Sequence, residues 1–177
     1  MSVTLRAGRP EDAVSLAGLA TQVWFDTYAI EGMREAWARY VFDTFTPDHF
    51  KALLVDIDRR LIVAAQDNNL LGYVLLGKPY SCPIDGYPQA TEIETLYVSR
   101  HFHGRGVGRA LVAEARAYVR AASGAGLWLK TWFRNANALA FYRAVGFVDV
   151  GITHFELEGA RHENRVLVDV NTCEPRA

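Results

Sequence analysis

The sequence predicts one strand-rich α+β domain, and three observations lead to this prediction. The chain has 177 residues, 50% of them hydrophobic, which is enough for one buried core. Short apolar runs typical of strands alternate with runs of helical period. In the middle of the chain a strand, a glycine-rich turn, a helix and another strand follow in that order. This order puts a loop and a helix N-terminus beside the end of a central strand.

The first half of the chain predicts a strand, a run of helices and a hairpin. Val3, Leu5 and Ala7 alternate with polar residues, and Pro10-Glu11-Asp12 suits the first turn of a helix. The further elements are a helix through Val14–Val23, helices over Met33–Phe45 and Thr46–Val55, the last with a Thr cap, and strands over Leu61–Gln66 and Leu70–Leu76 that pair antiparallel across Asp67-Asn68-Asn69.

The second half predicts a loop and then alternating strands and helices. Three prolines and the lack of any period indicate the loop, over Lys78–Thr91. Beyond it we expect strands over Glu92–Val98 and Leu127–Phe133, a helix over Val107–Ala122 stopped by Gly124 and Gly126, a helix over Ala136–Val145 ended by Gly146, and a closing hairpin of Phe147–Leu157 and Arg165–Val170.

The composition excludes several classes of partner. Lys and Arg total 19 against 20 Asp and Glu, so the net charge of -1 gives no general field for nucleic acid or an anionic membrane. Cys82 and Cys173 have no metal-binding or redox spacing, and we expect no metal. No stretch has about 18 uninterrupted apolar residues. We therefore expect a cytoplasmic protein without membrane or nucleic-acid partners.

The segment His103-Gly104-Arg105-Gly106-Val107-Gly108-Arg109 lies where the strand over Glu92–Val98 gives way to the long helix. Its glycines let backbone N–H groups approach an anion closely, and the helix dipole adds positive charge. Neighbouring Arg100 and His101 make the segment locally basic. We interpret it as a pyrophosphate site, with a solvated basic turn as the alternative. The spacing does not fit Gly-x-Gly-x-x-Gly, and Gly-Lys-Ser/Thr is absent.

Here the sequence resembles the GNAT acetyltransferases. His103-x-x-Gly106-x-Gly108 is similar to the family signature Gln/Arg-x-x-Gly-x-Gly/Ala except at its first position, and Asn135-x-x-Ala138-x-x-Phe141-Tyr142-x-x-x-Gly146-Phe147 is similar to the second signature. The resemblance implies a mixed, mostly antiparallel sheet of about seven strands flanked by helices. It also implies acetyl-CoA as cosubstrate, held by the loop of residues 103–109, by the backbone of Leu96-Tyr97-Val98 and by Asn135, which is equally a natural N-cap.

Two carboxylates in the central strand are the candidate bases. An alkyl ammonium with a pKa near ~10.4 must lose a proton before it can attack an acyl group. Glu92 and Glu94 share one strand face, where carboxylates are out of place for packing, unless that face is solvent-exposed. Polyamine acetylases of the family place a water-linked glutamate where Glu94 falls, and histone-type members place theirs nearer Glu92. We therefore prefer Glu94.

Tyr142 is the candidate acid, since the matching motif implies a donor beside the leaving sulfur. An apolar stripe of Ala138, Phe141 and Val145 predicts that Tyr142 lies at the stripe's edge, and the alternative is a tyrosine that only packs there.

Phe25 and Tyr28, followed by an aromatic-rich helix, resemble the substrate region of bacterial spermidine/spermine acetyltransferases. This favours a small amine or polyamine as acceptor. Protein N-terminal or lysine acetylation, and a non-catalytic acetyl-CoA sensor, are the alternatives. A homodimer is left open.

Overall fold

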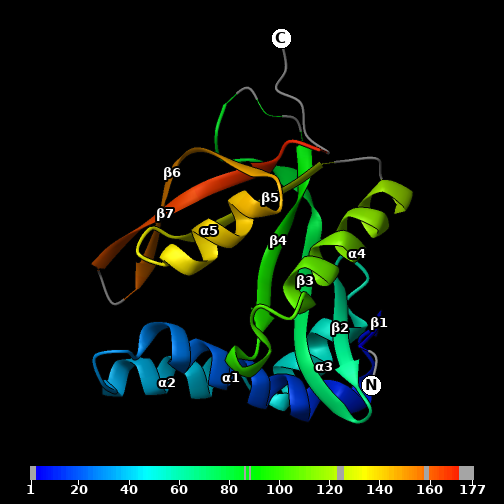
Figure 1. Cartoon of the computed structure of the whole chain (residues 1–177). Coiled ribbons are helices and arrows are strands. Elements are labelled where there is room, and N and C mark those ends of the chain that lie inside the picture. Colours follow the sequence, from blue (N-terminus) through cyan, green and yellow to red (C-terminus); the bar gives the residue numbers. More distant parts are fainter. Residues whose placement is uncertain (1–2, 86, 88, 123–125, 158–159, 172–177) are drawn as a thin grey trace. The chain divides into compact units, whose positions relative to one another are not determined.

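The computed structural model describes residues 3–85, 87, 89–122, 126–157 and 160–171. Figure 1 shows the elements, which are β1 (Thr4–Ala7), η1 (Pro10–Asp12), α1 (Ala13–Tyr28), α2 (Glu35–Thr44), α3 (Pro47–Val55), β2 (Arg60–Gln66), β3 (Asn69–Ser81), β4 (Gln89–Val98), η2 (Arg100–Phe102), α4 (Val107–Ala122), β5 (Gly126–Trp132), α5 (Ala136–Ala144), β6 (Phe147–Leu157) and β7 (Ala160–Asp169). The chain divides into two compact units, an N-terminal unit (residues 1–75 and 95–114) and a C-terminal unit (residues 76–94 and 115–177).

Within the described ranges the strands form a seven-stranded sheet of order β1-β2-β3-β4-β5-β7-β6. β1 pairs antiparallel with β2, and β5 and β6 each pair antiparallel with β7. β4 and β5 pair in parallel, in a register that runs from Ala90↔Gly126 to Glu92↔Trp128. The predicted α+β class and the mixed, mostly antiparallel sheet are confirmed.

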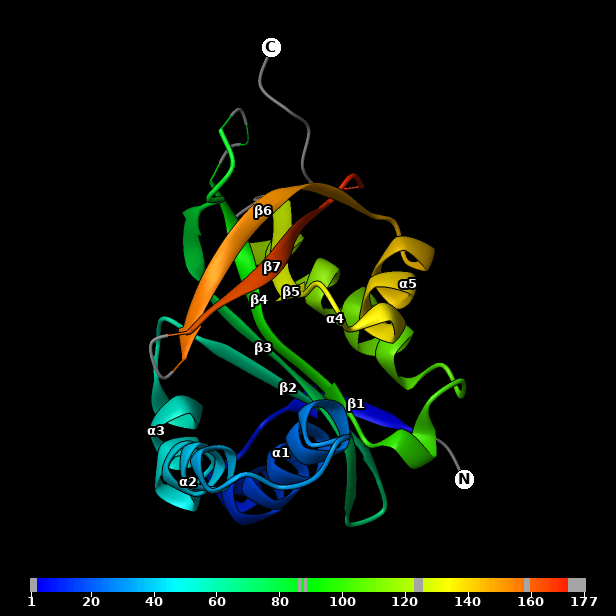
Figure 2. The ribbon, with the colours of Figure 1, turned by 90° about the vertical axis from the view of Figure 1, so that its left-hand side faces the viewer.

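Three helices dominate the N-terminal unit. α1 packs against α2 and α3, and Figure 2 shows the three side by side. Thr46 caps α3, because its Oγ1 accepts a 3.1 Å hydrogen bond from the N–H of His49, as predicted. The core of this unit is a cluster of buried side chains from α1, α3, β2 and β3: Ala13, Leu16, Ala17, Leu19, Ala20, Val23, Phe50, Leu61, Val63, Tyr73 and Leu75.

An ion pair holds the chain where β1 leads into η1. The guanidinium of Arg6 donates two hydrogen bonds to the carboxylate of Asp12, at 2.6 and 2.8 Å. These bonds hold the pKa of Asp12 below its usual value. Pro10, Glu11 and Asp12, which were predicted to start a helix, form η1, and α1 begins directly after them.

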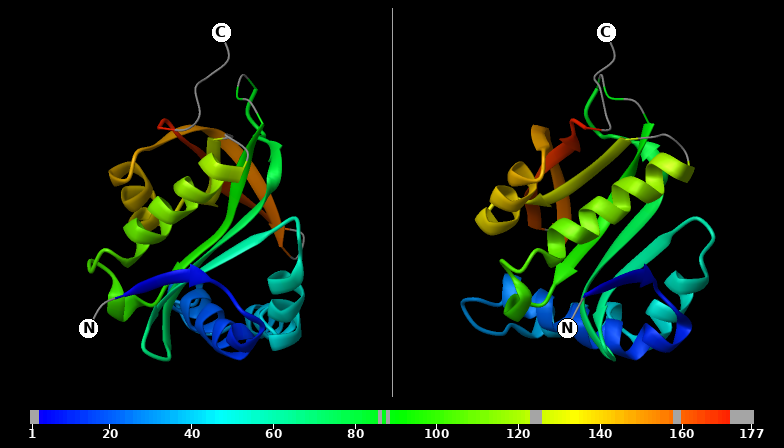
Figure 3. Two further views of the ribbon diagram at one scale, coloured as in Figure 1. Left: turned by 90° about the vertical axis from the view of Figure 1, so that its right-hand side faces the viewer. Right: turned by 45° about the vertical axis from the view of Figure 1, so that its right-hand side comes forward.

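The C-terminal unit is built around the β6–β7 hairpin. β7 lies between β5 and β6, and α5 packs against β6 (Figure 3). Its core includes Cys82, Ala90, Trp128, Val166 and Val168. The indole N–H of Trp128 donates to the carbonyl of Ala90 at 3.2 Å, which satisfies the one polar atom of that ring.

A buried ion pair links three elements of the C-terminal unit. Arg116 of α4 donates to both oxygens of Asp169 at the end of β7, at 2.6 and 2.9 Å. The same guanidinium donates to the carbonyl of Val145, the C-cap of α5. The carboxylate of Asp169 is 0% exposed, so its charge depends on these donors.

The predicted loop over Lys78–Thr91 is wrong at both ends. β3 continues to Ser81 and β4 begins at Gln89. Pro79 misled the prediction, because proline cannot donate to a strand ladder. β3 has 13 residues and its neighbour β2 has 7. The end of β3 that contains Pro79 therefore extends past β2, where no hydrogen bond to β2 is required of it. The predicted helix stop at Gly124 lies outside the described residues, and Gly126 opens β5.

Candidate active site

A glycine-rich turn joins the end of β4 to α4, as the sequence predicted. Gly104 and Gly106 have φ of 73° and 83°, a left-handed conformation that residues with a Cβ rarely adopt. The carbonyl of Gly106 accepts a 2.9 Å hydrogen bond from the N–H of Ala110, so the helical bonding of α4 begins there. The two glycines allow the chain to turn sharply into the helix.

The start of α4 offers backbone donors to a ligand. The N–H groups of Val107, Gly108 and Arg109 belong to the first helical turn, which has no intrahelical acceptor for them. A Cβ built on Gly104 or Gly106 meets no heavy atom within 4 Å, so the turn faces open space. Donors at the positive end of a helix dipole suit a phosphate group. The turn is therefore suited to an anionic group such as a phosphate.

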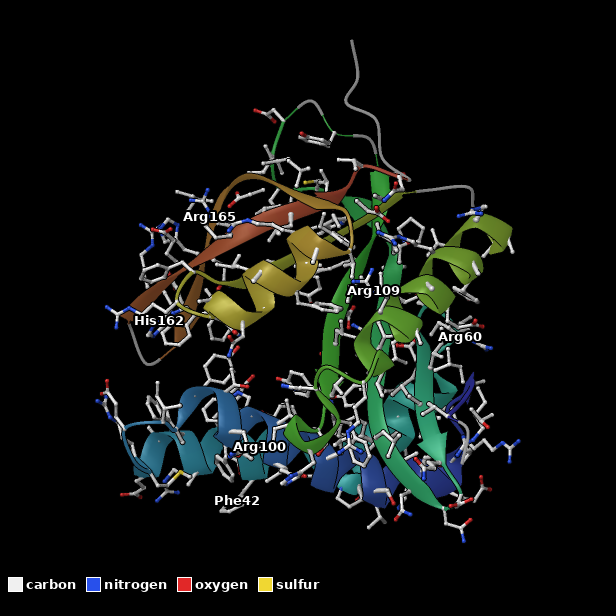
Figure 4. The ribbon with its side chains drawn as sticks, in the orientation of Figure 1. Phe42, Arg60, Arg100, Arg109, His162 and Arg165 are labelled. Atoms are coloured by element: carbon white, nitrogen blue, oxygen red, sulfur yellow. The ribbon has the colours of Figure 1, made fainter. Side chains whose placement is uncertain are left out.

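The basic side chains of this turn have different roles. The ring Nε2 of His103 lies 2.9 Å from the carbonyl of Val98, so the histidine ties the turn to the end of β4. The Arg105 guanidinium lies 5.4 Å from the ring centroid of Phe102. Arg109 is exposed on the first turn of α4 (Figure 4). The two arginines provide positive charge beside the backbone donors.

The last residues of β4 are half-buried, and their side chains pack within the N-terminal unit. The ring of Tyr97 lies 5.7 Å from that of Tyr73 and 6.4 Å from that of Phe45. A Cβ on Gly72 of β3 would lie 2.6 Å from the carbonyl oxygen of Tyr97, so only glycine allows this approach of β3 to β4. Because the Tyr97 side chain is committed to packing, Leu96-Tyr97-Val98 can serve a ligand only through its backbone.

The two candidate bases on β4 differ in their surroundings. The carboxylate of Glu92 lies 3.1 Å from the ammonium of Lys130 on β5 and is 16% exposed. Glu94 is exposed, two residues past the end of the β4–β5 register. Thr91 and Ile93 are buried, whereas Glu92 and Glu94 are more exposed, so burial alternates over residues 91–94 as predicted. By exposure alone, Glu94 is the more accessible of the two carboxylates.

Tyr142 lies on the buried face of α5, and the predicted stripe is wrong in detail. The buried residues of this helix are Leu139 and Tyr142, whereas Ala138 and Phe141 are half-buried. The Tyr142 ring lies 5.6 Å from that of Phe147 and is 7% exposed. The buried face of α5 is therefore centred on Leu139 and Tyr142 rather than on Ala138 and Phe141.

Asn135 is the N-cap of α5, as predicted. Its side-chain oxygen accepts a 3.0 Å hydrogen bond from the N–H of Ala138. The side-chain oxygen and nitrogen of Asn135 belong to one planar amide and point in different directions, so the nitrogen takes no part in this bond. At the other end of α5, Gly146 has φ of 94° and ends the helix.

Phe25 and Tyr28 belong to a group of packed rings from α1 and α2, which we call the aromatic cluster (Trp24, Phe25, Tyr28, Trp37, Tyr40 and Phe42). Trp24 is buried at its centre, with ring centroids 4.9 Å from Tyr28, 5.5 Å from Tyr40 and 6.1 Å from Trp37. Phe42 is 65% exposed and lies 6.3 Å from Phe25 (Figure 4). The aromatic cluster is thus buried at Trp24 and accessible to solvent at Phe42.

Two tyrosines of the cluster have perturbed acidity. Burial raises the pKa of Tyr28, and the neighbouring Tyr40 raises it further. Burial also raises the pKa of Tyr40, while a hydrogen bond with Thr44 acts in the opposite direction. Both phenols therefore keep their protons at neutral pH.

Two groups in this region that could attract a cation, the Asp26 carboxylate and the Trp37 ring, already contact arginines. The guanidinium of Arg100 lies 3.7 Å from the carboxylate of Asp26 on α1 (Figure 4). The guanidinium of Arg34 lies 5.0 Å from the ring centroid of Trp37. The second contact shows that this indole face accepts a cation.

The predicted site residues divide between the two units. Phe25, Tyr28, residues 96–98 and residues 103–109 lie in the N-terminal unit. Glu92, Glu94, Asn135 and Tyr142 lie in the C-terminal unit. Sequence reasoning missed Lys130, because its pairing with Glu92 depends on the β4–β5 register and leaves no local pattern.

Among residues placed by the structure, no group of three or more His, Cys, Asp or Glu side chains could hold a metal ion. Cys82 is buried, which raises the pKa of its thiol, and Cys173 lies outside the described residues. No helix in the described part of the chain is long and apolar enough to cross a membrane. The cytoplasmic location and the homodimer stay predictions.

Comparison with known proteins gives a consistent result. The profile of the acetyltransferase (GNAT) family matches residues 22–147. An uncharacterised N-acetyltransferase of Mycobacterium tuberculosis (strain ATCC 25618 / H37Rv) is 29% identical over 153 residues, which are 86% of this chain and 93% of the relative. The N-alpha-acetyltransferase RimI of the same strain is 30% identical over 120 residues, 67% of this chain and 72% of the relative.

The fold is also found in solved structures. The PaiA N-acetyltransferase from Thermoplasma acidophilum, crystallised in complex with coenzyme A, superposes with a TM-score of 0.73 at 20% identity. The match covers 93% of this chain and 98% of that protein. The architecture is therefore shared with a coenzyme A-binding protein of low sequence identity.

Proposed function

This chain belongs to the acetyltransferase (GNAT) family and is an acetyl-CoA-dependent N-acetyltransferase, and from this premise we propose that it acetylates a small primary amine by direct attack in a ternary complex. The observation that carries the proposal is the turn of Gly104 and Gly106 with the donor groups of Val107–Arg109. A neutral protein that concentrates backbone donors and arginines at one helix start is suited to a polyanionic cosubstrate.

The chain's own groups would hold acetyl-CoA at three places. The backbone N–H groups of the loop of residues 104–109 would bind the pyrophosphate, apart from that of Arg105, which donates to the carbonyl of Phe102 at 3.4 Å. The backbone of Leu96-Tyr97-Val98 would hydrogen-bond the pantetheine arm, since the Tyr97 ring packs elsewhere. The amide nitrogen of Asn135 would bind the same arm, because only the oxygen serves the cap. Bound acetyl-CoA supplies an activated acyl group to the amine.

Glu94 and Tyr142 would handle the protons of the transfer. The amine nitrogen bonds to the acetyl carbon while the carbon–sulfur bond breaks. The ammonium must first lose a proton, and we assign its removal to the exposed Glu94, through water. Glu92 is the second choice, because its carboxylate is only 16% exposed. The departing sulfur takes a proton from the hydroxyl of Tyr142, and the proton that the nitrogen loses as the amide forms returns to that oxygen through water.

We propose a polyamine as the first acceptor to test. The aromatic cluster presents ring faces, and Glu31 and Asp43 are exposed acids near it in sequence. The contact of Arg34 with Trp37 supports cation binding on these rings. The ion pair of Asp26 with Arg100 weakens the proposal, because it removes one carboxylate from the set available to a polycation.

Acetylation of a peptide N-terminus is the second candidate. It is favoured by the 30% identity with a protein named an N-alpha-acetyltransferase, over 72% of that relative. Lysine acetylation remains a further alternative for the acceptor.

The test is release of coenzyme A thiol from acetyl-CoA with and without acceptors. The panel holds spermidine, spermine, an aminoglycoside, a free amino acid and a ribosomal N-terminal peptide. We expect turnover with a polyamine well above background hydrolysis. Efficient turnover only of the peptide would contradict the acceptor and keep the acetyltransferase.

A further inference from the structure

Gly77 of β3 lies directly against the side chain of Glu94 on β4. A Cβ built on Gly77 would lie 2.5 Å from Oε1, 3.2 Å from Cδ and 3.4 Å from Cγ of Glu94. Both residues belong to the C-terminal unit. The carboxyl end of the glutamate therefore occupies the space that any other side chain at position 77 would fill.

The backbone at this position does not require glycine. The glycines with positive φ in the described chain are Gly32, Gly104, Gly106 and Gly146, and Gly77 is not one of them. Glycine in a strand interior weakens the strand, because it adds chain entropy and contributes no packing. Glycine therefore lowers the stability of β3 at this position, and the space that Glu94 occupies above Gly77 gives a structural reason for it.

Other glycines with close neighbours make a different kind of contact. A Cβ on Gly8 would meet the side chains of Leu54 and Leu61, and one on Gly72 would meet the backbone of Tyr97. Those contacts concern packing and strand approach. At Gly77 all three nearest atoms come from one carboxylate side chain. This side chain is the one that the proposed function uses as base.

We propose that Gly77 is a positioning residue that holds open the space in which the carboxylate of Glu94 takes its productive place. The inference rests on the proposed role of Glu94. A methyl group at position 77 would displace the far end of a flexible side chain and leave the strand intact. Displacement of a base by about 1 Å can cost on the order of 100-fold in rate.

The first test compares G77A with E94Q in steady-state acetylation. We expect G77A to lower kcat by about tenfold or more with the KM for acetyl-CoA unchanged. The loss should be greatest at neutral pH and shrink at high pH, where free amine no longer needs a base. Adding G77A to E94Q should cause no further loss, because the displaced group is already inactive.

The second test restores the space in another way. E94D shortens the side chain by one methylene, which relieves the contact with a methyl group at position 77. We expect the G77A/E94D double variant to be more active than the product of the two single effects. The melting temperature of G77A should not fall, since alanine is at least as good as glycine in a strand.

G18A is the matched control, because a Cβ on Gly18 of α1 meets nothing within 4 Å. It should retain the wild-type rate. If E94Q lowers kcat and G77A does not, or if G77A adds its loss on top of E94Q, the role of Gly77 is wrong. If E94Q itself has wild-type kcat, the proposed base is wrong, and a loss in G77A then reflects another cause.

Discussion

At the scale of single residues, the role of Tyr142 can be tested by removing its hydroxyl alone. Tyr142→Phe keeps the packing against Phe147 and removes one proton donor. We expect kcat to fall by roughly 100-fold or more, because a lost acid–base group has that effect, while acetyl-CoA affinity is retained. Steady-state kinetics and calorimetry measure the two quantities.

Tyr73→Phe is the control for that experiment. Tyr73 is 2% exposed, in the core of the N-terminal unit, and burial strongly raises the pKa of its phenol. Removing this hydroxyl should change stability without changing kcat. A wild-type kcat in Tyr142→Phe would reduce Tyr142 to a packing residue.

At the scale of elements, the turn that enters α4 is the feature to disturb. Gly106→Val places a branched side chain where φ is 83° and where the backbone faces open space. The side chain should block the approach of the pyrophosphate to the helix N-terminus. We expect acetyl-CoA affinity to fall at least tenfold, about 1.4 kcal/mol, in calorimetry.

Gly32→Val separates this effect from backbone strain. Gly32 has φ of 113° and also has no heavy atom within 4 Å of a built Cβ, but it lies between α1 and α2. The Gly32→Val variant should lose about as much stability as Gly106→Val and keep the wild-type affinity for acetyl-CoA. Unchanged affinity in Gly106→Val would remove the turn from the cosubstrate site.

At the scale of the whole molecule, stability should depend on the buried pair of Arg116 and Asp169. Arg116→Met leaves a fully buried carboxylate without its guanidinium and the C-cap carbonyl of α5 without a donor. Removing one partner of a buried pair costs about 3–5 kcal/mol. Urea unfolding at pH 7 should show a loss of this size.

Arg39→Met is the comparison, since Arg39 and Glu35 form an ion pair with side chains 73% and 77% exposed. Such pairs contribute at most about 1 kcal/mol. Equal losses in the two variants would show that the buried pair does not support the fold.

Local patterns predicted those parts of the molecule that depend on neighbouring residues. The cap at Thr46, the turn at Gly104 and Gly106, and the cap at Asn135 each follow from a few adjacent side chains. Period-two alternation likewise predicted that Glu92 and Glu94 point away from Ile93. The helices and most strands were found within a few residues of their expected bounds.

Contacts between distant segments were decided by tertiary structure. The strand ends around the predicted loop depend on pairing partners, and Pro79 suggested a break that longer strands override. The pairing of Glu92 with Lys130 follows the β4–β5 register, in which Glu92 lies opposite Trp128. The face of α5 that is buried was set by Leu139 and Tyr142, not by the stripe that period alone suggested.

By itself, the sequence determined the fold class, the glycine-rich turn, the family and the residue types that the chemistry needs. Short-range spacing encodes these features, because backbone conformation and helix capping depend on a few adjacent residues. Only the tertiary structure decided that Lys130 engages Glu92, that Arg100 engages Asp26 and that Gly77 makes room for Glu94. The physical reason is that side-chain contacts across strands and helices depend on register and packing, which no local pattern records.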